Sequence, residues 1–264
     1  MKRFSITDFT AKKQAGQKIA ILTAYDYFTA SLLDEAGIDA ILVGDSLGNV
    51  ILGYDTTVPV TLDNMIYHVR AVSRGCKRAL IIGDMPFLTY HTGIADALRN
   101  AGRFLQEGNA QAVKIEGGKE RVDIVRAMVE SGIPVMGHLG LTPQSVLQLG
   151  GFELQGKSDE TAQKLLEDAL ALEAAGAFSI VLEKIPATLA AKVTQNLRIP
   201  TIGIGGGVQC DGQVLVTHDM LGIFTRTPKF VKRYANLREP MIQAFQDYKR
   251  EVEESLFPGD ENSF

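Results

Sequence analysis

Short apolar runs alternate with helix-like segments along almost the whole chain, and this alternation limits the folds that the chain can adopt. Most runs are continuously apolar and bounded by Gly, Asp or Pro, as expected of strands buried on both faces of a parallel sheet. The predicted strands are Ile19–Thr23, Ala40–Val43, Ala79–Gly83, Ala112–Ile115, Pro134–Gly137, Ser179–Leu182, Thr201–Ile204 and a weak eighth near Leu221–Phe224. The predicted helices between them include Tyr27–Ala36, Gly93–Glu107, Glu120–Glu130, Asp159–Ala175 and Pro186–Asn196.

Eight strands that alternate with helices predict an α/β protein built as a single (β/α)8 TIM barrel. This fold needs about 250 residues, which agrees with the 264 residues of the chain. An open doubly wound sheet would be expected to carry a glycine-rich nucleotide motif after its first strand, and residues 23–27 contain no glycine. No linker rich in Pro, Gly or Ser divides the chain. We therefore expect residues 1–264 to form one domain with an N-terminal helix and a final amphipathic helix, around 241–256, packed on the body.

Charge and cysteine content exclude several classes of protein. The formal net charge of −4 lacks the basic surface of a nucleic-acid binder. No apolar run approaches the roughly 18 residues of a spanning helix, and the basic first residues are not followed by the apolar core of a secretory signal. Cys76 and Cys210 have neither zinc-site spacing nor the number needed for a disulfide framework. We expect a cytoplasmic protein without nucleic-acid or membrane partners.

Polar residues stand at the carboxyl ends of five successive predicted strands. In chain order they are Asp45 with Ser46, Asp84, Lys114 with Glu116, His138, and Glu183. In a barrel these strand ends meet at one mouth, where the active sites of the fold lie. Each residue alone is also explained as a cap or a structural ion pair. Because buried charge is unfavourable unless it is paired or used, the whole set predicts an active site.

The residue types predict metal-assisted chemistry on a 2-oxo acid. Asp45, Asp84 and Glu116 carry hard oxygen ligands suited to Mg²⁺, and zinc is less favoured without a His/Cys cluster. The positive charge of Lys114 suits a carboxylate or a developing enolate oxygen. Glu183 is the expected base for the substrate proton. His138 either donates a hydrogen bond to the substrate or is a hydrogen-bonded structural residue of the mouth.

Other features carry weaker predictions. Gly203–Gly207 follows the seventh strand, where many barrels bind phosphate, but it is also explained as a tight turn. His68, His91 and His218 do not follow strands, and we interpret them as structural or surface residues. The long segment Asn49–Tyr67 is a candidate cover for the mouth.

Several ordered motifs in the chain resemble the ketopantoate hydroxymethyltransferase family. They are LVGDSLG (42–48), DMPF (84–87), VKIEGG (113–118), GHLGLTPQS (137–145), and IGIGGG followed by DGQ (202–213). The resemblance runs from about Ile19 to the closing FPGDENSF. The wider relatives are the phosphoenolpyruvate mutase and isocitrate lyase barrels, which share Mg²⁺-enolate chemistry.

The resemblance implies transfer of a one-carbon unit from 5,10-methylenetetrahydrofolate to 3-methyl-2-oxobutanoate, which gives 2-dehydropantoate for pantothenate and coenzyme A synthesis. It implies Mg²⁺ at Asp45, Asp84 and Glu116. It implies substrate binding by Asp45, Ser46, Asp84 and Lys114, and a base at Glu183. It also implies a homo-oligomer, with a decamer the expected form.

The chain departs from the family pattern in two places, and two other functions stay open at this stage. Gly206 stands where the family more often has Ala, and Lys184 stands after the base where members often have Cys. Adjacent strand residues point to opposite faces, so we expect the Lys184 side chain not to meet Glu183. The alternatives are a Mg²⁺-dependent C–C lyase or decarboxylase of a 2-oxo acid on the same barrel, and a non-catalytic barrel that binds a metabolite.

Overall fold

Eight parallel strands form a closed barrel in chain order, with β1 hydrogen-bonded to β8. This architecture comes from a computed structural model that describes residues 3–264. The strands are β1 Ile19–Thr23, β2 Ala40–Val43, β3 Leu80–Asp84, β4 Ala112–Glu116, β5 Val135–Gly140, β6 Ser179–Glu183, β7 Thr201–Ile204 and β8 Gly212–Leu215. The predicted barrel is thereby confirmed.

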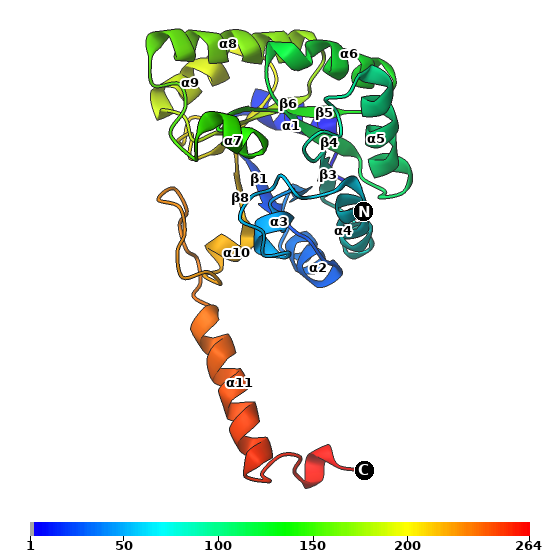
Figure 1. Cartoon of the computed structure of the whole chain (residues 1–264), viewed down its shortest axis with the longest axis vertical. Coiled ribbons are helices and arrows are strands. Elements are labelled where there is room, and N and C mark those ends of the chain that lie inside the picture. The colour runs from blue at the N-terminus through cyan, green and yellow to red at the C-terminus, as the bar shows by residue number, and fades with distance from the viewer. Residues whose placement is uncertain (1–2) are drawn as a thin grey trace. The chain divides into compact units, whose positions relative to one another are not determined.

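Helices surround the strands on the outside of the barrel (Figure 1). The α-helices of this part are α1 Ile6–Gln14, α2 Tyr27–Glu35, α3 Leu47–Val50, α4 Leu62–Gly75, α5 Ile94–Gln106, α6 Val122–Glu130, α7 Val146–Leu149, α8 Asp159–Ala174 and α9 Ala187–Asn196. Two short 3₁₀ helices, η1 Lys119–Arg121 and η2 Pro143–Ser145, lie in the loops after β4 and β5. Local signals set several helix starts. Asp26 accepts the backbone N–H of Thr29 and so caps α2, and Thr61 caps α4 in the same way from Asn64.

The first seven predicted strands are confirmed to within a few residues, but the predicted eighth strand is wrong. The strand that closes the barrel is β8, whereas residues 221–224 follow helix α10 (Thr217–Met220) in a turn where Gly222 has a φ of +68°. The prediction missed β8 because Gly212 and the exposed Gln213 leave this strand without the continuous apolar run by which the other strands were identified. A Cβ at Gly212 would lie 2.4 Å from the carbonyl oxygen of Ile19 on β1, so close strand contact requires glycine there.

The core consists of two apolar layers, one inside the barrel and one between the strands and the helices. Alternate strand residues such as Ile21, Ile82 and Met136 fill the interior. Phe9 of α1 is fully buried in this inner layer and packs edge-on against Phe178, which directly precedes β6. The outer layer holds the remaining strand faces against the helices. The amino end of the barrel is therefore closed by apolar contacts, which leaves polar side chains to the carboxyl end.

The two-residue period of a strand explains how polar residues enter the barrel. Ile82 belongs to the inner layer, so Asp84, two residues further along β3, faces the interior as well. The same step takes Ala112 to Lys114 on β4, and Met136 to His138 on β5. The barrel interior is therefore apolar near the amino ends of the strands and lined by ionisable side chains at their carboxyl ends.

Residues 217–264 form a second compact unit by internal contacts, separate from residues 1–216. The unit contains α10 Thr217–Met220, α11 Arg238–Glu253 and the 3₁₀ helix η3 Asp260–Asn262. Helix α11 has no buried residue, and its apolar side chains Met241, Phe245 and Tyr248 are exposed. One domain over residues 1–264, with the last helix packed on the body, stays a prediction. Within residues 3–264, no helix combines the length and apolar character needed to cross a membrane.

Candidate active site

The structure brings the predicted site residues to the carboxyl ends of strands β2 to β6. Asp45 and Ser46 follow β2, Asp84 ends β3, Lys114 and Glu116 lie on β4, His138 lies on β5 and Glu183 ends β6. Asp45, Asp84, Lys114, Glu116 and His138 are each at most 4% exposed. Glu183 and Ser46 are partly exposed. A buried ionisable group is at the mouth of the barrel on each of four adjacent strands.

A continuous line of polar contacts runs across the mouth from β2 to β6. The backbone N–H of Asp45 donates to Oδ2 of Asp84 at 3.2 Å, and Oδ1 of Asp84 lies 2.7 Å from Nζ of Lys114. Nζ of Lys114 is 3.7 Å from Oε1 of Glu116, which lies 3.3 Å from Nδ1 of His138. Nε2 of His138 is 3.2 Å from Oε2 of Glu183. We call this line, with Gln144 described below, the mouth cluster.

Burial, together with repulsion among carboxylates, raises the pKa values of the two aspartates on the β2–β3 side of the mouth cluster. Burial and the negative charges of Asp84 and Glu116 raise the pKa of Asp45 well above its usual value. Burial also raises the pKa of Asp84, although the Lys114 ammonium opposes this shift. Burial alone would lower the pKa of Lys114, but Asp84, Glu116 and Asp45 outweigh it and raise that pKa. Lys114 is therefore a fixed positive charge.

Histidine bridges two carboxylates on the β4–β6 side. Burial and the nearby Lys114 act to lower the pKa of His138, but the contacts with Glu116 and Glu183 outweigh them and raise it to about 9. For Glu116, burial acts to raise the pKa, and the stronger combined effect of His138, Lys114 and the Gln144 N–H lowers it. His138 thus carries a positive charge between two carboxylates at neutral pH.

Sequence analysis missed a central residue of the site, Gln144 in η2. Its side-chain Nε2 donates to Oδ2 of Asp45 and to the carbonyl oxygen of Met85, both at 2.9 Å, and its backbone N–H donates to Oε2 of Glu116. Tyr90 donates its hydroxyl proton to Oε1 of Gln144 at 2.7 Å. Gln144 lies within the motif GHLGLTPQS, but no charge or strand end marked it as a site residue.

Ser46 lies beside the mouth cluster and makes its hydrogen bond to another side chain. Its Oγ is 2.8 Å from the hydroxyl of Tyr25, which is buried after β1. A Cβ at Gly44 would lie 2.7 Å from Ser46 Oγ and 3.9 Å from Asp84 Oδ2, so the hydroxyl is close to the carboxylates. Ser46 is therefore placed at the edge of the site, next to the first predicted metal ligands.

The acidic residues of the mouth cluster fit a divalent cation. Among residues 3–264, no three His, Cys, Asp or Glu side chains already stand in a metal-binding arrangement. Four carboxylates nevertheless face only one ammonium and one imidazolium, which leaves an excess of negative charge. Burial and repulsion from Asp84 and Glu116 together raise the pKa of Asp45, and a bound cation would relieve the repulsion. Asp45, Asp84 and Glu116 are the candidate ligands, and each of them already has a protein partner, in Gln144, Lys114 and His138 respectively.

The other residues singled out in the sequence lie in loops or make contacts within the protein. The Lys184 side chain turns away from the mouth and donates to the carbonyl oxygen of Phe152, in line with the expectation that it does not meet Glu183. His68 Nδ1 contacts the carbonyl oxygen of Tyr25. Gly203 lies within β7, and residues 205–207 turn directly after it, with positive φ at Gly205 and Gly207. The expected cover 49–67 contains parts of α3 and α4 and the loop between them.

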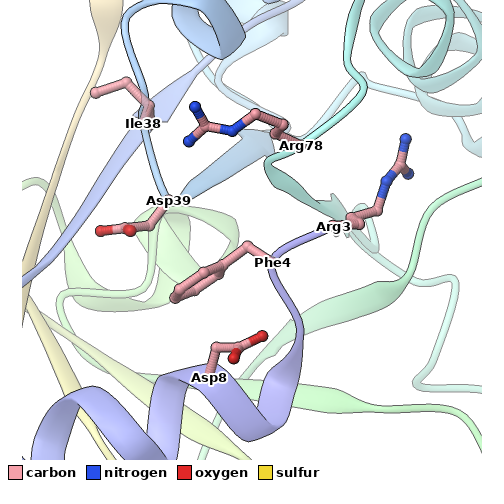
Figure 2. A pocket seen from close by; sticks show the side chains of 6 residues that line it. All are labelled: Arg3, Phe4, Asp8, Ile38, Asp39 and Arg78. Atoms are coloured by element: carbon pink, nitrogen blue, oxygen red, sulfur yellow. The ribbon is translucent and has the colours of Figure 1, made fainter. Parts of the chain in front are cut away.

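A small cavity lies at the opposite end of the barrel and does not belong to the mouth. Its volume is about 150 Å³, and Ile38, Asp39 and Arg78, which line it, precede β2 and β3. Figure 2 shows two arginines, Arg3 and Arg78, and two aspartates, Asp8 and Asp39, around the ring of Phe4. Asp39 already pairs with Lys12 at 2.6 Å. The balanced charges give this cavity no preference for an anion or a cation.

The fold and the mouth cluster define a (β/α)8 barrel protein with a carboxylate-lined mouth. The chain superposes on phosphonopyruvate hydrolase with a TM-score of 0.65 and 12% identity, covering 100% of this chain and 92% of that chain. It superposes on 2,3-dimethylmalate lyase, a PEP mutase/isocitrate lyase superfamily member, with a TM-score of 0.60 and 18% identity, covering 98% and 90%. These likenesses confirm the predicted fold.

Residues 3–260 match the family described as ketopantoate hydroxymethyltransferase, and the chain belongs to this family. The 3-methyl-2-oxobutanoate hydroxymethyltransferase of Carboxydothermus hydrogenoformans is 58% identical over 265 residues, which cover 100% of this chain and 96% of the relative. The protein of the same name from Dehalococcoides mccartyi (strain CBDB1) is 60% identical over 263 residues, with 99% and 94% covered. The resemblance carried by the sequence motifs is confirmed.

Proposed function

We propose that the mouth cluster is the catalytic centre for transfer of a hydroxymethyl group from 5,10-methylenetetrahydrofolate to 3-methyl-2-oxobutanoate. The chain's activity is that of a hydroxymethyltransferase in pantothenate biosynthesis, as in its full-length relatives. The observation that carries the assignment to these residues is the unbroken line of contacts from Asp45 to Glu183. The high identity with transferases over the whole chain favours this reaction over cleavage by a lyase.

The overall step forms one C–C bond and releases tetrahydrofolate. Carbon C3 of the 2-oxo acid loses its proton and bonds to the methylene carbon of the folate. Both C–N bonds of that carbon break, and water supplies the hydroxyl group of 2-dehydropantoate. The C3 proton and the remaining water proton end on the two folate nitrogens, so atoms and charge balance without an oxidant or a reductant.

Glu183 is the proposed base for the C3 proton. Its Oε2 faces His138, whereas Oε1 has no hydrogen-bond partner among residues 3–264 and is available to the substrate. The charged His138 holds the carboxylate from one side, and the partly exposed position at the end of β6 gives a ligand access to the other side. A positioned base of this kind contributes roughly 10²- to 10⁴-fold to the rate.

Lys114 and the aspartates are the proposed binding groups for the 2-oxo acid. The fixed positive charge of Lys114 is suited to the substrate carboxylate and to the oxygen on which enolate charge develops. Mg²⁺ held by Asp45 and Asp84, with Glu116 close by, would supply a Lewis acid for the same two oxygens. Ser46 at the edge of the cluster is the proposed neutral hydrogen-bond donor to the substrate. Both ring nitrogens of His138 face carboxylates, so its proposed role in substrate binding is to hold Glu116 and Glu183 in place.

Proton exchange tests the base and the metal without the folate. Proton NMR of 3-methyl-2-oxobutanoate in D₂O is recorded with the protein and Mg²⁺, and again after addition of EDTA. We expect the C3 proton signal to disappear only with the metal present. Repeating the measurement with tetrahydrofolate separates a base that needs the second substrate from a wrong substrate. Absence of exchange under all of these conditions would contradict the assignment.

We also propose a cytoplasmic homo-oligomer, expected to be a decamer. The exposed apolar side chains Met241, Phe245 and Tyr248 of α11 offer a surface that a second copy of the chain would cover. Light scattering after size exclusion measures the mass. Phe245→Glu is expected to lower it, and Gln243→Glu, a polar exchange on the same helix, is expected to leave it unchanged.

A further inference from the structure

The mouth of the barrel is polar on one side only. The ionisable side chains of the mouth cluster come from β2 to β6. On β7 and β8 the inward positions nearest the mouth carry Ile204 and Val214, which pack with the inner apolar layer. Strand β8 pairs with β7 at Gly212 and Ile202, so Val214 and Ile204, two residues further along, lie side by side. The mouth therefore has an apolar side, to which the steps above assign no role.

Strand register places Ile204 beside the proposed base. Glu183 and Ile204 are register partners on the neighbouring strands β6 and β7. Register partners point to the same face of a sheet, and neighbouring strands are roughly 4.8 Å apart. Two residues earlier, Val181 and Ile202 are also partners, and both belong to the inner layer. Ile204 thus faces the barrel interior directly next to Glu183.

The other flank of Glu183 has no side chain at the same level. There its register partner is Gly140 of β5. A Cβ at Gly140 would meet the carbonyl oxygen of Glu183, so the two strands approach closely at this point. His138, two residues earlier on β5, reaches Oε2 of Glu183 from below. Of the two register partners of Glu183, only Ile204 can contact a ligand through a side chain.

Ile204 is open to the mouth. It is partly exposed, whereas Ile202, two residues earlier on the same strand, is fully buried. Residues 205–207, which follow, are all glycine and form the turn after β7, with positive φ at Gly205 and Gly207. Because this turn carries no side chain, it cannot cover Ile204 as a turn of larger residues would.

The proposed substrate is divided in the same way as the mouth. Its carboxylate and keto oxygens are on C1 and C2, and the proposed partners of these oxygens are Lys114 and the aspartates of β2 and β3. Its C3 carries two methyl groups and the proton that Glu183 is proposed to remove. Each methyl group is one bond from C3. When C3 is in contact with Glu183 and the oxygens point to β2–β4, the methyl groups are therefore beside β7.

We propose that Ile204 forms the apolar subsite for the methyl groups on C3 and so determines which branched 2-oxo acids the protein accepts. The inference rests on the proposed function, since it uses the assigned substrate and base. Ile204 moves no proton. Its contact with the methyl groups would place the C3 proton against Glu183, and it would limit the size of the groups that C3 can carry.

Selectivity between two acids tests the subsite. 3-Methyl-2-oxopentanoate has one more methylene on C3 than 3-methyl-2-oxobutanoate and the same single C3 proton. One methylene in an apolar pocket changes kcat/KM by roughly 10- to 200-fold. For Ile204→Ala we expect the ratio of kcat/KM for the larger acid to that for the smaller acid to rise about 10-fold or more over wild type. The rise should come mainly from a higher KM for the smaller acid.

Two further variants complete the comparison. Ile204→Val removes a single methylene and is expected to shift the ratio in the same direction by less, and it carries the test if Ile204→Ala does not fold. Ile38→Ala is the matched control, because Ile38 is also a partly exposed isoleucine but precedes β2 at the opposite end of the barrel. We expect Ile38→Ala to keep the wild-type ratio.

Methyl NMR locates the contact without the folate or turnover. In protein labelled with ¹³C at the isoleucine δ-methyl groups, the Ile204 signal is identified by its loss in Ile204→Val. With Mg²⁺ present, we expect 3-methyl-2-oxobutanoate to shift this signal saturably and to leave the Ile38 signal in place. An intermolecular NOE from the Ile204 methyl group to the methyl groups of the acid is expected as well.

Failure of the subsite and failure of the proposed function give different results. If wild-type protein acts on 3-methyl-2-oxobutanoate but both Ile204 variants keep the wild-type ratio, the subsite is wrong and the function stands. An equal change of the ratio in Ile38→Ala would indicate general loosening of the barrel and would also contradict the subsite. If wild-type protein neither exchanges the C3 proton nor turns over this acid, the proposed function is wrong and the subsite fails with it.

Discussion

Nε2 of His138 lies 3.2 Å from Oε2 of Glu183, while Nδ1 of the same ring lies 3.3 Å from Oε1 of Glu116. One charged imidazole on β5 thus connects the carboxylate of β4 with that of β6. This contact leaves the other oxygen of Glu183 for the substrate. The His138 side chain therefore fixes the position of the proposed base, Glu183, relative to Glu116.

Replacement of Glu183 by Gln is expected to abolish turnover and leave substrate binding nearly intact. The amide has almost the same shape but cannot accept the C3 proton. We expect kcat to fall roughly 10²- to 10⁴-fold. Binding of 3-methyl-2-oxobutanoate, measured by calorimetry with Mg²⁺, serves as the control. A variant that keeps more than about a tenth of the wild-type rate would show that another group is the base.

Replacement of Gln144 by Leu is expected to weaken metal activation. The change removes the donor that holds Oδ2 of Asp45 and the acceptor for the Tyr90 hydroxyl. Groups that orient metal ligands typically contribute 10- to 100-fold to metal affinity or activity. We expect a shift of this size in the Mg²⁺ concentration for half-maximal rate. Tyr90→Phe keeps the donor to Asp45 and is expected to shift it less. An unchanged Mg²⁺ titration for Gln144→Leu would remove Asp45 from the ligand set.

Asp34 is expected to make the free energy of unfolding depend on pH in the acidic range. Its carboxylate accepts the backbone N–H groups of Lys77, Arg78 and Ala79 at 2.8 to 3.0 Å. Burial acts to raise the pKa of Asp34, but these bonds together lower it. A lowered folded-state pKa means that the stabilisation is present above about pH 4, the ordinary value for Asp, and is lost as the pH falls below it.

Asp34→Asn checks this linkage by urea unfolding between pH 3 and pH 7. We expect the variant to be less stable by about 1–3 kcal/mol at pH 7, with the difference shrinking as the pH falls. Asp123→Asn, at an exposed position of α6, is the matched control. A difference between wild type and Asp34→Asn that is constant with pH would contradict the charged hydrogen bonds.

Gly83→Ala is expected to destabilise the barrel through one contact. An added Cβ would lie 2.2 Å from Cδ1 of Phe104, a fully buried ring of α5. Overpacking of this kind destabilises by about 1–3 kcal/mol. Phe104→Leu in the same chain should recover part of the loss, which a double-mutant cycle measures.

Gly102→Ala, on the same helix as Phe104, is the control for Gly83→Ala. A Cβ there meets nothing within 4 Å, so better helix propensity should raise stability by about 0.5–1 kcal/mol. Equal effects of the two glycine substitutions would exclude the strand–helix contact as the cause.

The ionisable part of the site was predictable because strand periodicity is a local property. Once Ile82 and Met136 face the interior, Asp84 and His138 must do so as well, and the carboxyl ends of parallel strands share one mouth. Because buried charges are unfavourable unless they are paired, these side chains are expected to pair with one another. Six ionisable residues, spread from position 45 to position 183, could be assigned to one site from the sequence for this reason.

Gln144 could not be predicted in the same way. It lies in a 3₁₀ turn outside the strands, and its partner Asp45 is 99 residues away. A neutral amide gives no charge signal, and its role depends on how the loop after β5 folds over β2. Strand β8 was missed for a related reason. Its Gly212 is required by the close approach of β1, which no local sequence pattern reveals.

The barrel, the family and the ionisable residues at the mouth could be predicted from the sequence, because the alternation of strands and helices and the polar residues at strand ends are local patterns. The contacts that depend on closure of the barrel became known only from the folded chain. These are the bridge of His138 between Glu116 and Glu183, and the hydrogen bond from Gln144 to Asp45. Such contacts join segments whose separation is set by the closed sheet, and no local pattern encodes that distance.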